Sequence, residues 1–176
     1  GLVQQVLEES PGIEVLLRKK RPGHTVFHYR FNERPAEGIP RQTALERGIY
    51  LRNRMQIKTG SLELNMQTAS GIPEFDTPSY RTEMLIKALQ DNGDMGARRV
   101  IVFNPGQGHA ATAVWKIFQP ETLALVDRDL LALCYTRLNL MENGCEDERI
   151  RVYHQTGIDI ESEVSPDLII GMLREE

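Results

Sequence analysis

The chain has 176 residues, of which 40% are hydrophobic and 26% charged. This length and composition are typical of one globular domain, with a small appendage at most. No apolar run approaches the ~20 residues that span a membrane, and the first nine residues are too polar for a secretory signal. The two cysteines, Cys134 and Cys145, show no disulfide or metal-binding pattern, so we expect reduced thiols, no metal and a cytoplasmic location.

Positive charge is concentrated in the first third of the chain. Residues 15–58 hold 11 Lys and Arg side chains against three acidic ones, whereas the whole chain has a net charge of −4. The densest part is the basic cluster Arg18, Lys19, Lys20 and Arg21. Such an asymmetry indicates either a region that binds a polyanion or a solvated basic surface without a partner, and the sequence leaves both interpretations open.

Up to about residue 91, short apolar runs alternate with turn residues, which indicates a β-rich region. Val15–Leu17 is such a run, and it precedes the basic cluster and a Pro-Gly turn. The pattern then predicts, in chain order, a strand at 25–31, a loop at 34–41, a hairpin of strands 49–57 and 62–66, and a short helix at 82–90.

From residue 99 onward, continuous apolar runs alternate with segments of helical composition. The pattern predicts, in chain order, a strand at 99–103, a helix at 110–118, a strand at 122–126, a helix at 130–141, and strands at 150–154 and 167–171. This order is typical of βαβ units in an α/β protein with a parallel sheet. We therefore expect two parts: a β-rich N-terminal region over residues 1–80 and a Rossmann-like domain over residues 81–176.

A glycine turn, Asn104-Pro105-Gly106-Gln107-Gly108-His109-Ala110, joins the first of these strands to its helix. Asp127 follows the second strand, 21 positions after Gly106, where nucleotide-binding βαβ units hold the ribose hydroxyls. An ordinary βα turn followed by a surface Asp is the alternative. Ala111 stands at the third glycine position of dinucleotide-binding turns and no Gly-Lys-Ser/Thr follows, so the pattern favours a nucleoside cofactor without a pyrophosphate.

On these residues the chain resembles class I S-adenosylmethionine (SAM)-dependent methyltransferases, and in particular the "methyltransferase small" family, which includes guanine-N2 methyltransferases of ribosomal RNA. The family's acid-x-Gly-x-Gly-x-Gly turn is matched at Gly106 and Gly108, but Asn104 and Ala110 depart from it. Further matches are Asp127, Asn139 and the Asn143-Gly144 turn. Phe75–Ser79 resembles the family's Asp-x-Gly-Ser/Thr segment, with Pro78 in place of the glycine.

The resemblance implies SAM as cofactor and a sheet in the order 3-2-1-4. The cofactor-binding residues that it suggests are Asn104, Pro105, Gly106, Gly108, His109, Asp127, Arg128 and Gly157. It also implies methyl transfer to a base in RNA, whose phosphates the basic cluster Arg18, Lys19, Lys20 and Arg21 would bind. Two alternatives stay open: a methyltransferase of a small molecule or protein, and an inactive SAM- or RNA-binding module.

The family's Asn/Asp-Pro-Pro-aromatic motif, which holds the accepting amine, would fall after the fourth strand. Gly171-Met172-Leu173-Arg174 occupies that place, so no catalytic residue is assigned. Because the family's sheet has seven strands and four are recognisable here, we expect the chain to be truncated. The apolar strand 167–171 would then be an open edge that pairs with missing residues or with a second copy in a homodimer.

Overall fold

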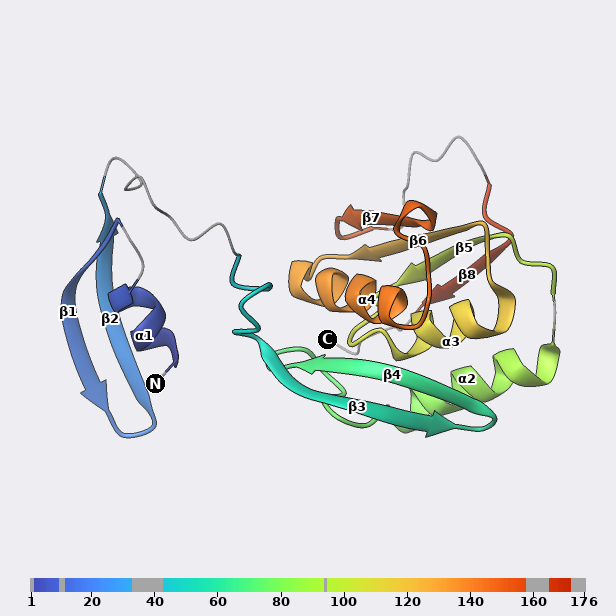
Figure 1. Cartoon of the computed structure of the whole chain (residues 1–176), viewed down its shortest axis with the longest axis horizontal. Coiled ribbons are helices and arrows are strands. Elements are labelled where there is room, and N and C mark those ends of the chain that lie inside the picture. The colour runs from blue at the N-terminus through green and yellow to red at the C-terminus, as the bar shows by residue number, and fades with distance from the viewer. Residues whose placement is uncertain (1, 10–11, 33–42, 94, 158–164, 172–176) are drawn as a thin grey trace. The chain divides into compact units, whose positions relative to one another are not determined.

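A computed structural model describes residues 2–9, 12–32, 43–93, 95–157 and 165–171 of the chain. These residues belong to two compact units, Gly1–Tyr50 and Leu51–Glu176 (Figure 1). Among the described residues, no helix is both long enough and apolar enough to cross a membrane. The predicted loop at 34–41 lies outside the described residues.

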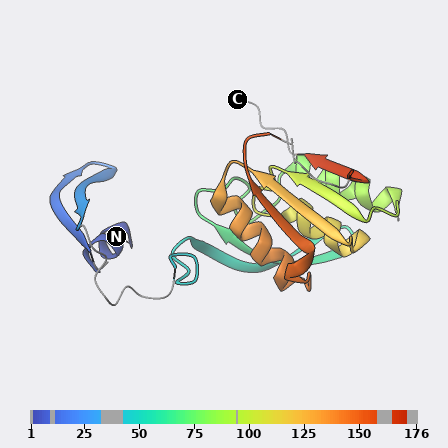
Figure 2. The same cartoon turned by 90° about the horizontal axis from the view of Figure 1, so that it is seen from above.

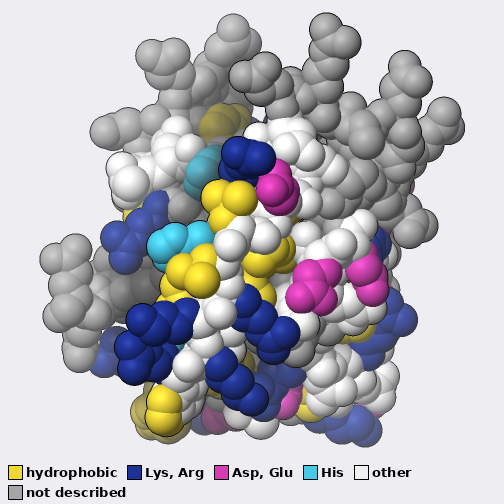
Figure 3. Space-filling model, turned by 90° about the vertical axis from the view of Figure 1, so that its left-hand side faces the viewer, with side chains coloured by type: hydrophobic (Ala, Val, Ile, Leu, Met, Phe, Trp, Pro, Cys, Tyr) yellow, Lys and Arg dark blue, Asp and Glu magenta, His cyan; other side chains and the backbone are white. Residues whose placement is uncertain are grey.

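The first unit contains helix α1 (Leu2–Glu9) and the antiparallel strands β1 (Ile13–Arg21) and β2 (His24–Phe31). Strand β2 confirms the strand predicted at 25–31. Its partner β1 runs through the basic cluster, where the sequence pattern indicated no strand. Arg18, Lys19, Lys20 and Arg21 are all exposed. Lys and Arg side chains gather beside His and hydrophobic side chains on the face of the molecule in Figure 3.

The second unit begins with the hairpin of β3 (Leu51–Thr59) and β4 (Leu62–Ala69), followed by helix α2 (Tyr80–Asn92). The apolar face of this hairpin packs Ile57, Leu64 and Met66 against Ile86 of α2 and Ala113 of helix α3 (His109–Phe118). The hairpin therefore belongs to the same unit as the helices. The two compact units divide after Tyr50, whereas the sequence suggested a boundary at residue 80. The hairpin falls in the second unit because its apolar face packs against these helices.

A parallel four-stranded sheet is built from β5 (Arg99–Phe103), β6 (Thr122–Asp127), β7 (Ile150–His154) and β8 (Leu168–Gly171) in the order β7-β6-β5-β8 (Figure 2). This is the expected order 3-2-1-4, and β8 is one edge of the sheet. Helix α3 (His109–Phe118) connects β5 to β6, and helix α4 (Leu130–Glu142) with the short 3₁₀ turn η1 (Asp147–Arg149) connects β6 to β7.

The main core lies between the sheet and these helices. Val100, Val102, Leu123 and Leu125 contribute alternate side chains from the two central strands, and each is at most 1% exposed. They pack with Ala111 and Val114 of α3, Leu133 and Leu140 of α4, and Leu89 of α2. The burial of both faces of β5 and β6 explains why these strands are continuous apolar runs in the sequence.

Candidate functional site

The glycine turn lies at the carboxyl end of β5, where its backbone adopts three left-handed conformations. Asn104, Gly106 and Gly108 have φ angles of +52°, +59° and +94°. The Asn104 N–H donates to the Val126 carbonyl (2.8 Å), and the Gly108 N–H donates to the Pro105 carbonyl (2.9 Å). The first bond ties the turn to β6, so the turn and the end of β6 lie side by side at the carboxyl edge of the sheet.

The two glycines have different surroundings. A Cβ on Gly108 would lie 3.0 Å from the Cα of Thr136, so the side-chain-free Gly108 allows the turn to approach helix α4 closely. A Cβ on Gly106 would meet no atom within 4 Å. The main chain at Gly106 is therefore open to a ligand, as expected of a turn that takes a cofactor against its backbone.

Asp127 ends β6 and is fully buried beside the turn. Its Oδ1 accepts a hydrogen bond from the Asp129 N–H (2.9 Å), and its main-chain carbonyl accepts one from the Gln155 N–H (3.0 Å). Asp129 in turn caps helix α4, because its Oδ1 accepts from Leu131 N–H (2.9 Å) and Ala132 N–H (3.3 Å). These bonds fix the carboxylate of Asp127 at the edge of the sheet where the sequence placed it.

The remaining residues suggested for the cofactor lie at the same edge. Arg128 is exposed, and its carbonyl lies 3.0 Å from Nε2 of His154 at the end of β7. Gly157 is also exposed, and its carbonyl accepts a hydrogen bond from the Gln155 side chain (2.8 Å). The basic cluster, in contrast, belongs to the first unit.

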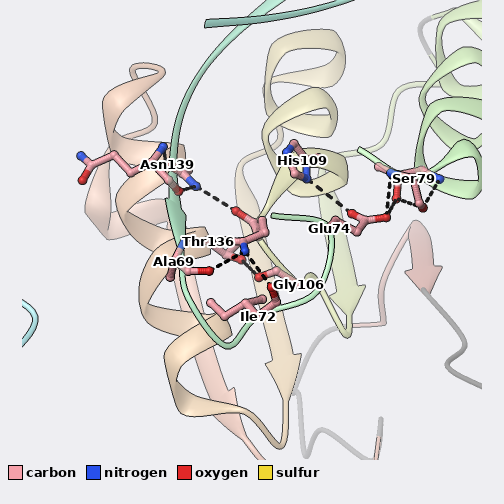
Figure 4. Close-up of polar contacts among 11 residues, drawn as sticks. Ala69, Ile72, Glu74, Ser79, Gly106, His109, Thr136 and Asn139 are labelled. Carbon is pink, nitrogen blue, oxygen red and sulfur yellow. Dashed lines mark hydrogen bonds and ion pairs between the residues drawn. The ribbon is translucent and has the colours of Figure 1, made fainter. Parts of the chain in front are cut away.

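His109 is fully buried at the start of α3, with its Nδ1 3.4 Å from Oε2 of Glu74 (Figure 4). The sequence placed His109 among the cofactor-binding residues, but its ring points toward this carboxylate. The other carboxylate oxygen of Glu74 accepts from the Ser79 N–H (3.1 Å) and the Thr82 hydroxyl (2.5 Å). Burial opposes ionisation of Glu74, but the nearby His109 ring and the hydrogen bonds from Ser79 and Thr82 outweigh it and lower its pKa to about 2.

Gln107 and Glu74 are two residues of this region that the sequence did not single out. The fully buried side chain of Gln107 connects the glycine turn to the segment that follows β4. Oε1 accepts from the Ala69 N–H, and Nε2 donates to the carbonyls of Ala69 and Ile72, all at 3.0 Å. A long polar residue between two glycines is the only sequence signal of this contact. Glu74 has no such signal, because its partner His109 is 35 residues away in the chain.

The residues aligned with the amine-holding motif, Met172, Leu173 and Arg174, lie outside the described part of the chain, and Gly171 ends β8. The described residues contain no group of three His, Cys, Asp or Glu side chains that could hold a metal ion. The site that the structure does show is a glycine turn, an open main chain and a buried acid.

No protein-family model and no curated protein matches the chain. Among solved structures, it is similar to the T. thermophilus 16S rRNA N2 G1207 methyltransferase (RsmC) in complex with AdoMet and guanosine. The TM-score is 0.60 and the identity 15%, over 91% of this chain and 40% of that one.

Two further similar structures are M. jannaschii TYW2 in complex with AdoMet and a SAM-dependent methyltransferase of Agrobacterium tumefaciens. Both are 15% identical to this chain. The match to TYW2 covers 66% of this chain and 49% of that structure, with a TM-score of 0.49. The match to the Agrobacterium tumefaciens enzyme covers 78% of this chain and 38% of that structure, with a TM-score of 0.42.

The likeness to RsmC, together with the strand order β7-β6-β5-β8, shows that the chain has the Rossmann-like fold of class I methyltransferases. The chain spans less than half of the length of the RsmC structure that it matches. The class I fold implied by the sequence resemblance is thus confirmed.

Proposed function

We propose that the second unit binds SAM and that the chain is the cofactor-binding part of a methyltransferase that acts on a base in RNA. The observation that carries this proposal is the pairing of an open main chain at Gly106 with the buried carboxylate of Asp127, on adjacent parallel strands. The similar RsmC structure contains AdoMet and guanosine, which supports both the cofactor and the class of acceptor.

The residues of the site suit the parts of SAM. The missing side chain at Gly106 leaves room for the cofactor against the turn. The first-turn N–H groups of α3, which have no partner within the helix, suit its carboxylate. Asp127 would accept hydrogen bonds from the ribose hydroxyls, with Arg128 and Gly157 at the rim. Bound SAM supplies a methyl group on a positively charged sulfur, and the protein's contribution is to hold donor and acceptor in line.

The hairpin of β1 and β2 suits RNA. Arg18 lies over the ring of Phe27, 5.9 Å from its centroid, and Tyr29 and Phe31 are 46% and 70% exposed. Basic side chains and exposed aromatic rings on one hairpin suit a partner that has phosphates to bind and bases to stack. We propose that Arg18, Lys19, Lys20 and Arg21 bind the phosphates of the acceptor. The cytoplasmic location expected from the two cysteines is part of this proposal.

One alternative is supported by a specific observation. Gly171-Met172-Leu173-Arg174 has no amide or carboxylate side chain that could hold an accepting amine. This favours, as second candidate, a module that binds SAM or RNA without catalysing transfer.

Substitution of Asp127 tests cofactor binding. Asp127→Ala removes a charged hydrogen-bond acceptor and should weaken SAM binding by about 1.5–3 kcal/mol, or roughly tenfold to 150-fold. Titration calorimetry with SAM measures this loss. Asp147→Ala is the control, because Asp147 is paired with Arg137 at the surface and should leave the affinity unchanged. An Asp127→Ala protein that stays folded and binds SAM like the wild type would refute the site.

A further inference from the structure

Side-chain amides line the free edge of β4. In the antiparallel hairpin, Asn65, Gln67 and Ala69 direct their N–H and C=O groups away from β3, and each exchanges two hydrogen bonds with one carboxamide. Asn143 binds Asn65 (3.1 and 2.7 Å), Asn139 binds Gln67 (2.7 and 2.9 Å), and Gln107 binds Ala69 (both 3.0 Å). These carboxamides satisfy the edge of β4 as a neighbouring strand would.

The second N–H of each carboxamide links it to the next segment. Asn143 donates to the Asn139 carbonyl (2.8 Å), Asn139 donates to the Gln107 carbonyl (2.8 Å), and Gln107 donates to the Ile72 carbonyl (3.0 Å). Asn139 and Gln107 are fully buried, and Asn143 is 7% exposed. We call these residues, Asn143, Asn139 and Gln107, the carboxamide ladder. It runs from the end of α4 along β4 into the glycine turn.

The ladder restrains the turn from two sides. The Gln107 side chain donates to the Ile72 carbonyl after β4, and the Gln107 main-chain carbonyl accepts from Asn139. Figure 4 labels the two partners, Ile72 and Asn139. The next carbonyl upstream, that of Gly106, lies 3.4 Å from the hydroxyl of Thr136. Rotation of the peptide units around Gly106 would break these buried hydrogen bonds, so the turn keeps one backbone conformation before any ligand arrives.

We propose that Gln107 is a positioning residue, which sets the affinity for SAM by holding the main chain of Gly106 in the conformation that accepts the cofactor. The proposal rests on the proposed SAM site. A rigid turn binds more tightly than a mobile one because the ordering cost is met when the protein folds. The end of β4 and the segment after it therefore take part in cofactor binding through Gln107, the one ladder residue that lies in the turn, although no cofactor contact of their own is invoked.

The chain offers a matched control. Asn143 makes the same pair of bonds to the same strand edge, but it lies at the far end of the ladder, after helix α4. Gln107→Glu and Asn143→Asp each replace a buried amide by an acid of the same size, and each loses two N–H donors. Both variants should therefore lose stability. Only the change at Gln107 should alter the turn.

The experiment compares wild type, Gln107→Glu and Asn143→Asp in the full chain. Calorimetry with SAM gives the affinity at a temperature where circular dichroism shows all proteins folded, and thermal unfolding gives the stability. Hydrogen exchange by NMR of the Gly108 N–H, which is bound to the Pro105 carbonyl, reports opening of the turn without any ligand. Gln107→Met is added in case a buried Glu prevents folding.

We expect a Kd at least tenfold higher and faster exchange at Gly108 for the Gln107 variants. Asn143→Asp should keep the Kd within twofold and the exchange rate of the wild type, despite its lower melting temperature. Equal changes in both positions, or unchanged Kd in a folded Gln107 variant, would overturn the proposal. If the wild-type protein does not bind SAM, the proposed function fails. In that case the exchange rate of the Gly108 N–H still tests the role of Gln107, and an equal rate in the wild type and all variants would refute it.

Discussion

Gly106 and Gly108 look alike in the sequence, but a side chain at each would meet a different environment. Alanine at Gly106 would carry the cost of a left-handed backbone, about 1 kcal/mol, and its Cβ would point into open space. Alanine at Gly108 would carry a similar backbone cost, and its Cβ would also press against the backbone of Thr136 at 3.0 Å. A helix backbone cannot move aside as a flexible side chain can.

We therefore predict that Gly108→Ala destabilises the protein by a further 1–3 kcal/mol or so relative to Gly106→Ala, a range typical of overpacking. Urea unfolding of the two variants and the wild type measures the difference. Gly106→Ala should instead weaken SAM binding, because its methyl group occupies the space open to the cofactor. Equal stability of the two variants would contradict the close contact between the turn and α4.

The partly buried carboxylate of Glu74 makes stability depend on pH. Its pKa is lowered from 4.5 to about 2, so its hydrogen bonds stabilise the folded state fully above pH 4.5. This stabilisation is lost as the pH falls from 4.5 toward 2, because the unfolded chain takes up the proton first. A displacement of this size corresponds to roughly 3 kcal/mol as an order of magnitude.

We predict that Glu74→Gln is less stable than the wild type at pH 7 and that the difference shrinks as the pH falls from 4.5 toward 2. Unfolding by urea at a series of pH values measures it. Asp147→Asn is a suitable comparison, since Asp147 is an exposed partner of Arg137 and should show a much smaller effect. A difference between Glu74→Gln and wild type that stays constant over this range would mean that Glu74 titrates normally.

At the scale of secondary-structure elements, local patterns predicted the parallel sheet well. Strands β5 and β6 are buried on both faces, and this leaves a continuous apolar run that is readable without knowing the partners. Strand β1 was missed because its last four residues are basic and exposed, so that only backbone pairing with β2 makes them a strand. The β3–β4 hairpin was predicted as strands, but alternation shows only that one face is apolar and does not show what covers it.

In the candidate site, the positions of residues that directly follow buried strands were predictable from the sequence, as the strands themselves were. Gly106, Gly108 and Asp127 follow buried strands, and parallel pairing brings the ends of such strands together. The side-chain contacts of Glu74 and Gln107 were not predictable, because each joins segments more than 30 residues apart. Asn139 was matched by resemblance alone, and the structure supplies its physical reason: the amide pairs with the edge of β4.

At the scale of the whole molecule, charge and core are divided between the two units. All the buried hydrophobic residues of the core clusters described above lie between Ile57 and Ile170, within the second unit. Residues 51–176 carry 13 Lys and Arg against 19 Asp and Glu, whereas residues 1–50 carry eight against six. An acidic second unit does not attract RNA, so RNA affinity should depend on the first.

We predict that residues 51–176 alone fold and bind SAM with the affinity of the full chain, since they include the core clusters and the residues proposed to bind SAM. RNA binding should fall strongly in this shortened protein.

Replacing Arg18, Lys19, Lys20 and Arg21 by Gln in the full chain should also weaken RNA binding. The slope of log K against log salt should fall by up to about 3, because about 0.7 counterions are released per single-strand phosphate. Fluorescence anisotropy with a labelled RNA over a series of salt concentrations measures both effects, and calorimetry checks that SAM binding persists. If the shortened protein bound RNA as tightly as the full chain, or if RNA affinity did not change with salt, the first unit would have no role in holding the acceptor. The acceptor would then bind to the second unit, which would hold both the SAM site and the acceptor site.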